Sequence, residues 1–204
     1  MLMPKIFECF ATPLISLGLM IVVMPVRLPA QQHEVPANIE KSKSTMRTLY
    51  ELDQSHHGDA DRSKYREQVQ ESMRSGKIQS AKDYYYAAFI FQHGQKPSDY
   101  LYAHVLAVTA VSKGLHAAIW LSAATLDRYL QSIQGSQIFG TQYGFGSRDD
   151  QEPYDRKMLS DAIRETWCVA PQLKQSQILH EKRAGKGFGS TRTCALPDAR
   201  FDKN

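Results

Sequence analysis

The chain has 204 residues, of which 42% are hydrophobic and 23% charged, and 25 Lys and Arg against 21 Asp and Glu give a net charge of +4. After removal of an N-terminal leader this length suffices for one hydrophobic core and is short for two. The small charge excess favours no nucleic-acid partner.

The N-terminus is typical of a secretory signal peptide. Lys5 lies in a short leading region, an apolar run extends from Leu14 to Met24, and Ala30 offers a small residue at a cleavage point before Gln31. The run is shorter than the roughly 20 residues of a membrane-spanning helix. We therefore predict a signal peptide over residues 1–30, export to the periplasm or the exterior, and no membrane span after cleavage. An uncleaved membrane anchor is the alternative.

Cys168 and Cys194 are the two cysteines that follow this leader. An even pair in an oxidising compartment favours a disulfide, and no histidine stands at zinc-ligand spacing. We expect the bridge to tie down a basic, glycine-rich tail over residues 174–204, which otherwise resembles a solvated, flexible end. We expect neither a metal nor a cofactor.

Apolar residues recur at helical spacing along most of the remaining chain, and no long strand pattern competes with them. The first predicted helix carries Met46, Leu49 and Tyr50 on one face, the second carries Tyr65, Val69 and Met73, and the third runs from Tyr84 to His93. Gly76 and Gly94 end the second and third helices. Ser80 and Asp83 resemble a capping box before the third helix, which should be central because most of its faces are apolar.

Two further helices are predicted to form an antiparallel hairpin, because only a short turn around Gly114 separates them. A Ser98 cap would begin the first of them. Its expected inner face is Leu101, Val105, Val108 and Val111, and that of its partner, from His116 to Gly135, includes Trp120, Leu121, Ala124 and Tyr129. The pair is similar to one helix pair of tetratricopeptide or Sel1-type repeats, although no second copy is visible.

A sixth helix is expected from Lys157 to Trp167, with Met158, Leu159, Ala162 and Ile163 pointing inward. The sequence thus predicts an all-α fold over residues 31–173. We expect a single-domain bundle of about six helices with a repeat-like antiparallel helix pair.

Polar residues fall on helix ends and apolar faces, where folding alone needs few of them. The candidate binding residues are Asp53, Gln54, Gln92, His93, Asp127, Arg128, Gln137, Thr141 and Gln142. The helical period turns the carboxyl groups of Asp53 and Asp127 inward. His93 ends the third helix, where the negative end of the helix dipole favours an imidazolium. Gly140 can adopt a backbone conformation closed to other residues.

The order of these groups resembles an uncharacterised bacterial helical family that is known only as a domain of unknown function. The resemblance covers about Met46 to Leu173. It rests on Asp53-Gln54, Asp83 with Ala87-Ala88, Gln92-His93, Trp120-Leu121, Asp127-Arg128, Gln137-x-Phe139-Gly140-Thr141-Gln142 and, less specifically, Asp161 to Arg164 with Ala170 to Leu173. It implies a helical fold with a shared polar cluster and no known activity. His56-His57 and the basic tail depart from the family.

Three functions fit these residues. The first is a binding or interaction module for an unknown peptide or small polar ligand, with Arg128 pairing a carboxylate or phosphate and an open groove lined by Tyr84 to Tyr86 or by Tyr143. The second is a structural envelope protein, in which Asp127 and Arg128 form a buried ion pair. The loop glutamines and Thr141 would then satisfy helix ends.

The third function is a hydrolase, with His93 as general base oriented by Asp127 or Asp53. It ranks last because the familiar signatures of a nucleophile elbow or a zinc protease are absent. His56-His57 with Asp59 and Asp61 could ligate a metal, but adjacent histidines in such a loop are more often solvated, so no metal site is predicted.

Overall fold

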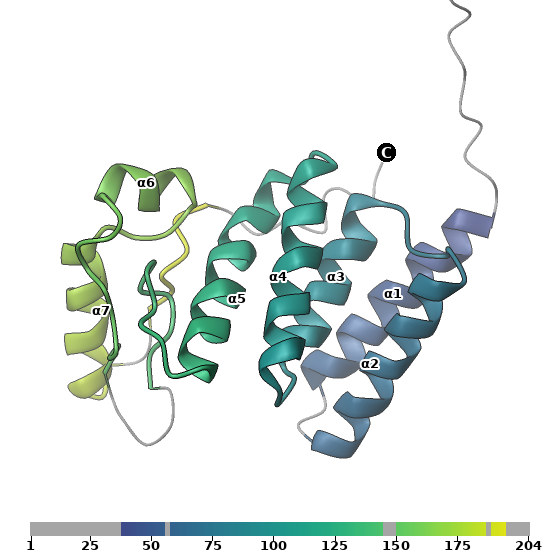
Figure 1. The fold of residues 1–204 in the computed structure, drawn as a ribbon, viewed down its shortest axis with the longest axis horizontal. Helices are drawn as coiled ribbons and strands as arrows, with labels where there is room; N and C mark the ends of the chain where they lie inside the picture. Colours follow the sequence, from purple (N-terminus) through teal and green to yellow (C-terminus); the bar gives the residue numbers. More distant parts are fainter. Residues whose placement is uncertain (1–37, 56–57, 145–149, 187–188, 195–204) are drawn as a thin grey trace, which may run out of the picture. The chain divides into compact units, whose positions relative to one another are not determined.

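The computed structural model describes residues 38–55, 58–144, 150–186 and 189–194, with side chains from residue 45 onward (Figure 1). The predicted signal peptide, the His56-His57 pair and residues 195–204 lie outside these ranges. The all-α prediction is confirmed, since these ranges contain helices and two isolated β-bridges but no strand. The helices are α1 (Asn38–Ser55), α2 (Asp59–Arg74), α3 (Ala81–Gln92), α4 (Pro97–Ser112), the short 3-10 helix η1 (His116–Ala118), α5 (Ile119–Ser132), α6 (Asp161–Thr166) and α7 (Gln172–Arg183).

Helix α3 is central, as its sequence predicts. The Ser80 hydroxyl accepts a hydrogen bond from the Asp83 backbone N–H, and the Asp83 carboxylate accepts one from the Ser80 N–H, which completes the expected capping box. Ile90 and Phe91 are almost fully buried, and α1, α2 and α4 all pack against this helix. Figure 1 shows α3, α4 and α5 side by side, as the hairpin prediction requires.

The inner face of α4 differs from the prediction. Leu101, Val105 and Val108 are 41%, 50% and 41% exposed, whereas the buried face consists of Ala103, Leu106, Ala107 and Ala110. Small side chains allow the close approach of α3 and α5 on both sides of α4, so packing geometry outweighs hydrophobicity here. The expected Ser98 cap is also wrong: the N-cap is Lys96, Pro97 is the first helical residue, and Asp99 accepts the Lys96 N–H at 3.2 Å.

The chain after α5 corrects two further expectations. The predicted helix Lys157 to Trp167 is limited to the six residues of α6, and the expected inward residues Met158 and Ile163 are 62% and 43% exposed. Its fully buried residue is instead Arg164. The expected domain boundary after Leu173 falls inside α7, which buries Ile178 and so belongs to the packed structure.

The C-terminal segment 189–194 is held by several contacts and not by the disulfide alone. The predicted bridge between Cys168 and Cys194 is confirmed, with 5.2 Å between the two Cα atoms. The Ala170 N–H donates to Thr191 O at 2.8 Å and the Thr193 N–H to Cys168 O at 2.9 Å. The Arg192 guanidinium lies 4.3 Å from the centre of the Trp120 ring. The expectation of a solvated end is therefore corrected for this segment.

Removal of the disulfide should lower the free energy of unfolding by about 3–4 kcal/mol, because the bridge closes a loop between residues 26 positions apart. Denaturant unfolding of Cys168→Ser/Cys194→Ser beside the oxidised protein measures this loss. In hydrogen exchange the Ala170 and Thr193 amides should lose protection first, since segment 189–194 supplies or accepts their bonds. Equal midpoints for the two proteins would contradict this role of the bridge.

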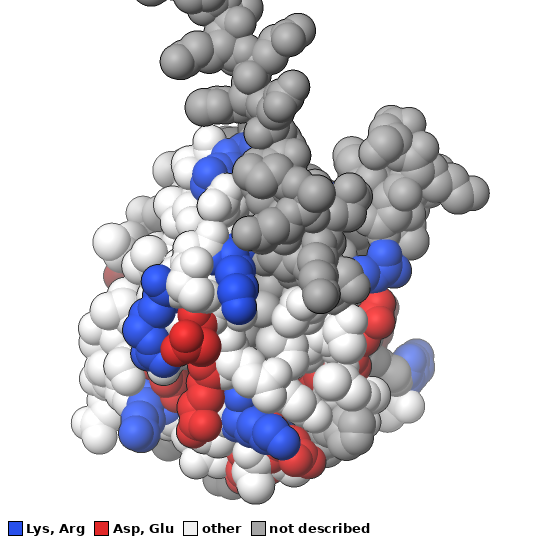
Figure 2. Space-filling view, turned by 90° about the vertical axis from the view of Figure 1, so that its right-hand side faces the viewer, with Lys and Arg blue, Asp and Glu red and all other residues white. Residues whose placement is uncertain are grey.

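Charged residues of both signs are interspersed on the face formed by α1 and α2, as Figure 2 shows. Pairs such as Arg47 with Glu51 and Arg74 with Glu71, each at 2.8 Å, are exposed and add little stability. No helix in the described part of the chain is long and apolar enough to cross a membrane.

Candidate functional site

The nine predicted polar residues lie together because successive helices are antiparallel. The C-terminal ends of α1, α3 and α5 and the N-terminal ends of α2 and α4 meet at one end of the bundle, the lower end in Figure 1. Hydrogen bonds link six of these residues into one set, which consists of Gln92, Asp127, Arg128, Gln137, Thr141 and Gln142. Asp53, Gln54 and His93 form a second set, which adjoins the first because His93 follows Gln92 in the chain. The structure thus brings the predicted residues together, although it gives them different roles.

Asp127 holds the loop that follows α5. Its Oδ1 accepts the Ile138 N–H at 2.8 Å and the Phe139 N–H at 3.0 Å, and its Oδ2 accepts the Thr141 N–H at 2.9 Å and the Thr141 hydroxyl at 2.8 Å. The carboxylate is fully buried. Burial raises the pKa of Asp127 above its ordinary value, and these four hydrogen bonds oppose the rise. With all these acceptor positions used and no exposed surface, Asp127 has a structural role.

Buried glutamines complete this loop. Gln137 Nε2 donates to the carbonyls of Gln142 and Gln151, while Gln137 Oε1 accepts the Gln142 N–H at 3.0 Å. The Gln151 amide in turn contacts Gln175 Oε1 at 3.1 Å. Gly140 has the predicted left-handed backbone, with φ of 81°, and a Cβ there would collide with the Gln175 side chain. Gln137, Gln142 and Gly140 therefore fix the loop that forms one wall of the candidate site.

Arg128 faces a different environment from its neighbour Asp127. Its Nε and Nη2 donate to Gln142 Oε1 at 3.2 and 3.1 Å, and its Nη1 donates to the Gln92 carbonyl at 2.6 Å. All three contacts are made to neutral oxygens, and the predicted ion pair with Asp127 is wrong: no carboxylate pairs with Arg128 among the residues that the structure describes. Burial lowers the pKa of the Arg128 guanidinium, which remains a cation at neutral pH.

A small hollow opens beside Arg128. It has a volume of about 210 Å³ and is lined by Tyr100, Arg128, Gln142, Tyr143 and Gly144. The Arg128 Cζ lies 6.0 Å from the centre of the Tyr100 ring, and the Tyr143 hydroxyl donates to the Gln175 carbonyl at 3.3 Å, which orients that ring. Arg128 is the charged residue of this described lining. The hollow is therefore lined by one cation and two tyrosines.

His93 and Asp53 form a second polar pair near the end of α3. His93 Nδ1 lies 2.6 Å from Asp53 Oδ2, and the Gln54 amide donates to the same oxygen at 3.0 Å. Arg62 Nε is 3.8 Å from Asp53 Oδ1, an ion pair without a hydrogen bond. The Asp53 side chain is fully buried and that of His93 is 23% exposed. Of the two partners predicted to orient His93, Asp53 is the one in contact.

The tyrosines of α3 that were predicted to line a groove pack at least in part into the core. Tyr85 is buried in the core, with its ring centre 4.9 Å from that of Phe89, and Tyr50 packs 5.0 Å from Tyr86. A second hollow, of about 290 Å³, lies between α2 and the start of α4, with Arg66, Glu67 and Lys96 among its lining residues. It includes none of the nine predicted residues.

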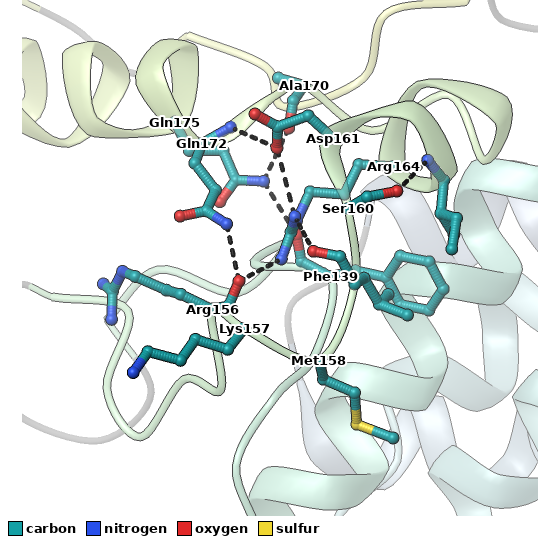
Figure 3. Close-up of polar contacts among 12 residues, drawn as sticks. Phe139, Arg156, Lys157, Met158, Ser160, Asp161, Arg164, Ala170, Gln172 and Gln175 are labelled. Carbon is teal, nitrogen blue, oxygen red and sulfur yellow. Dashed lines mark hydrogen bonds and ion pairs between the residues drawn. The ribbon is translucent and has the colours of Figure 1, made fainter.

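Arg164 was missed by the sequence analysis and shows what a purely structural arginine looks like in this fold. It is fully buried, and all five of its N–H groups have acceptors, of which Figure 3 shows those on Arg156 and Asp161. Its partners are Tyr154 Oη at 2.9 Å, Leu159 O at 2.6 Å, Asp161 Oδ1 at 3.2 Å, Ile138 O at 3.4 Å and Arg156 O at 3.2 Å. No periodicity reveals such a residue, because its acceptors are mostly backbone carbonyls of irregular loops.

No family model, curated protein or solved structure matches the chain. The resemblance to a family of unknown function therefore stays an expectation.

Proposed function

We propose that the protein is an exported binding module whose ligand presents an anionic group, a carboxylate or a phosphate, to Arg128. The observation that carries this proposal is a half-buried guanidinium with neutral partners that borders an open hollow. The Cys168–Cys194 disulfide supports export, since such bonds persist in oxidising compartments.

The energetic argument starts from desolvation. A cation removed from water loses hydration that neutral carbonyl and amide oxygens replace only in part. A ligand anion beside Arg128 would restore that loss, because charge-assisted hydrogen bonds are about twice as strong as neutral ones. Arg164 is a second arginine of the same chain with which Arg128 can be compared. Each of its five N–H groups has an acceptor, and one of these acceptors is the Asp161 carboxylate. Arg128 differs in having no carboxylate partner in the described residues.

The size of the hollow limits the ligand. About 210 Å³ is below the roughly 300–1,000 Å³ typical of sites for drug-sized molecules. A small molecule fits, as does the terminal group of a peptide. The Tyr100 and Tyr143 rings would supply most of the apolar contact.

An anion should stabilise the protein only through Arg128. We expect an equimolar mixture of acetate, benzoate, methyl phosphate and phenyl phosphate to raise the Tm of the protein relative to chloride at the same ionic strength. The rise should vanish in Arg128→Gln and persist in Arg66→Gln. Arg66 is a matched control because it binds the carbonyl of His93, one residue beyond the Gln92 carbonyl that Arg128 binds. An equal rise in all three proteins would indicate nonspecific salt effects and contradict the proposal.

The structural alternative accounts for part of the cluster. Asp127 and Thr141 are buried and hydrogen-bonded to each other, and the buried Gln137 is bonded to Gln142, as that alternative predicts. It does not explain why Arg128 has no carboxylate partner among the described residues or why a hollow opens beside it. We therefore assign the loop residues to the scaffold and Arg128 to binding.

The hydrolase alternative stays a prediction, and its favourable observation is the 2.6 Å contact between Asp53 and His93. A general base needs a substrate within reach, and His93 does not line the hollow beside Arg128. Asp127 is committed to the loop backbone and cannot orient His93. Binding therefore remains the better-supported function.

A further inference from the structure

The hollow beside Arg128 also constrains which anion it would hold, an inference that rests on the proposed function above. A guanidinium has five N–H donors, and three hydrogen bonds of Arg128 are accounted for by Gln142 and Gln92. Two N–H groups therefore have no acceptor among the described residues. Two donors fixed on one planar group match the two oxygens of a carboxylate.

Three other donors of the described lining are committed elsewhere: the Gln142 amide, the Tyr143 hydroxyl and the Gly144 N–H. The Gln142 amide nitrogen donates to Ala124 O at 3.0 Å and to Thr141 Oγ1 at 3.1 Å. The Gly144 N–H donates to Asp150 O at 2.9 Å. These groups therefore add no donor for a phosphate oxygen beyond the two N–H groups of Arg128, and the Tyr100 hydroxyl is a further donor of the described lining.

Charge balance leads to the same choice. Arg128 carries one positive charge and is the only charged residue in the described lining. A carboxylate neutralises it, whereas a phosphate ester carries about 1.5 to 2 negative charges at neutral pH and would leave a net negative charge in a partly desolvated site. Burial raises the pKa of Tyr143 above its ordinary value, so this wall stays neutral and does not alter the balance.

The walls select the part of the ligand next to the carboxylate. Tyr100 and Tyr143 present aromatic rings, and the guanidinium lies 6.0 Å from the Tyr100 ring centre. Aromatic rings pack favourably against each other in offset or edge-to-face arrangements. We infer that the hollow takes an aromatic monocarboxylate, held by the two remaining N–H groups of Arg128 and packed against Tyr100 and Tyr143.

Calorimetric titration with single compounds tests this inference. Benzoate should bind about tenfold more tightly than either acetate or phenyl phosphate, and binding should be lost in Arg128→Gln and kept in Arg66→Gln. Arg128→Lys retains the charge without the planar donor pair and should bind benzoate at least about tenfold more weakly, which keeps the test valid if Arg128→Gln fails to fold. N-acetylphenylalanine and its amide separate the two sources of this chemistry. Tighter binding of the acid than of benzoate indicates a peptide C-terminus, and the converse indicates a free aromatic acid.

Failure of the inference differs from failure of the proposed function. If phenyl phosphate binds through Arg128 at least as tightly as benzoate, the site holds anions but the carboxylate inference is wrong. If acetate equals benzoate, the role of the aromatic walls is wrong. If no compound depends on Arg128, both the inference and the proposed function are overturned.

Discussion

Asp127→Asn is expected to lower the free energy of unfolding by about 3–5 kcal/mol, because it breaks a fully buried, charge-assisted set of hydrogen bonds. An asparagine keeps one oxygen and replaces the other with an NH₂ group. That NH₂ would face either the Thr141 N–H or the N–H groups of Ile138 and Phe139, so that donors oppose donors. Urea unfolding followed by far-UV circular dichroism measures the loss.

Asp155→Asn is the matched control for this substitution. Asp155 Oδ1 also accepts two backbone N–H groups, those of Lys157 and Met158 at 3.0 and 3.2 Å, but the residue is exposed. Water can replace these bonds, so we expect a loss of at most about 1 kcal/mol. Equal losses for the two substitutions would show that the burial of Asp127 contributes nothing and would contradict its structural role.

The neighbours Asp127 and Arg128 show how far sequence reasoning reaches at this site. Helical spacing placed the Asp127 carboxylate on the inner face, and that placement is correct because the spacing follows from backbone geometry alone. Adjacent opposite charges also predicted an ion pair, and this was wrong. Residues i and i+1 of a helix point about 100° apart, so their partners come from different segments. Those partners, the 138–141 loop and Gln142, depend on a fold that periodicity does not specify.

The α4 helix shows the same limit for the core. Its most hydrophobic stripe, with Leu101, Val105 and Val108, was predicted to point inward, and it is exposed. The alanines that pack against α3 and α5 are less hydrophobic but allow close approach of the helices. In α3, by contrast, apolar residues on most faces predicted a central helix, and Ser80 with Asp83 predicted a capping box at its start. The structure confirms both.

The loops around α6 and α7 were the least predictable part, since glutamine side chains and one arginine fill the place of apolar residues there. Gln175 Nε2 donates to the carbonyls of Phe139 and Ala170 at 2.8 and 2.7 Å, and it is almost fully buried. A buried amide of this kind stabilises irregular backbone by satisfying carbonyls that no helix or sheet pairs. Hydrophobic periodicity cannot detect such packing, and the prediction of a flexible tail after Leu173 followed from that.

Arg164→Met is expected to destabilise the protein more than any of the other substitutions, by about 5 kcal/mol or more, because it leaves several buried acceptors unsatisfied. The side chain is replaced by one of similar length, so the effect reports the lost donors to Leu159, Ile138 and Arg156 more than lost volume. Arg164→Lys should recover only a small part, since one ammonium cannot reach acceptors arranged around a planar fork. Thermal and urea unfolding of both variants measure the loss.

Arg156→Met is the control that separates burial from arginine chemistry. Arg156 lies over the same Tyr154 ring as Arg164, at 4.5 against 5.7 Å from its centre, and pairs with Glu152 at 2.7 Å. Because Arg156 is exposed, its ring contact and ion pair compete with water, and its loss should cost at most about 1 kcal/mol. If Arg164→Met and Arg156→Met lose the same free energy of unfolding, the five hydrogen bonds of Arg164 contribute no net stability. The contrast between a saturated Arg164 and an unsaturated Arg128, from which the binding site was inferred, would then lose its energetic basis.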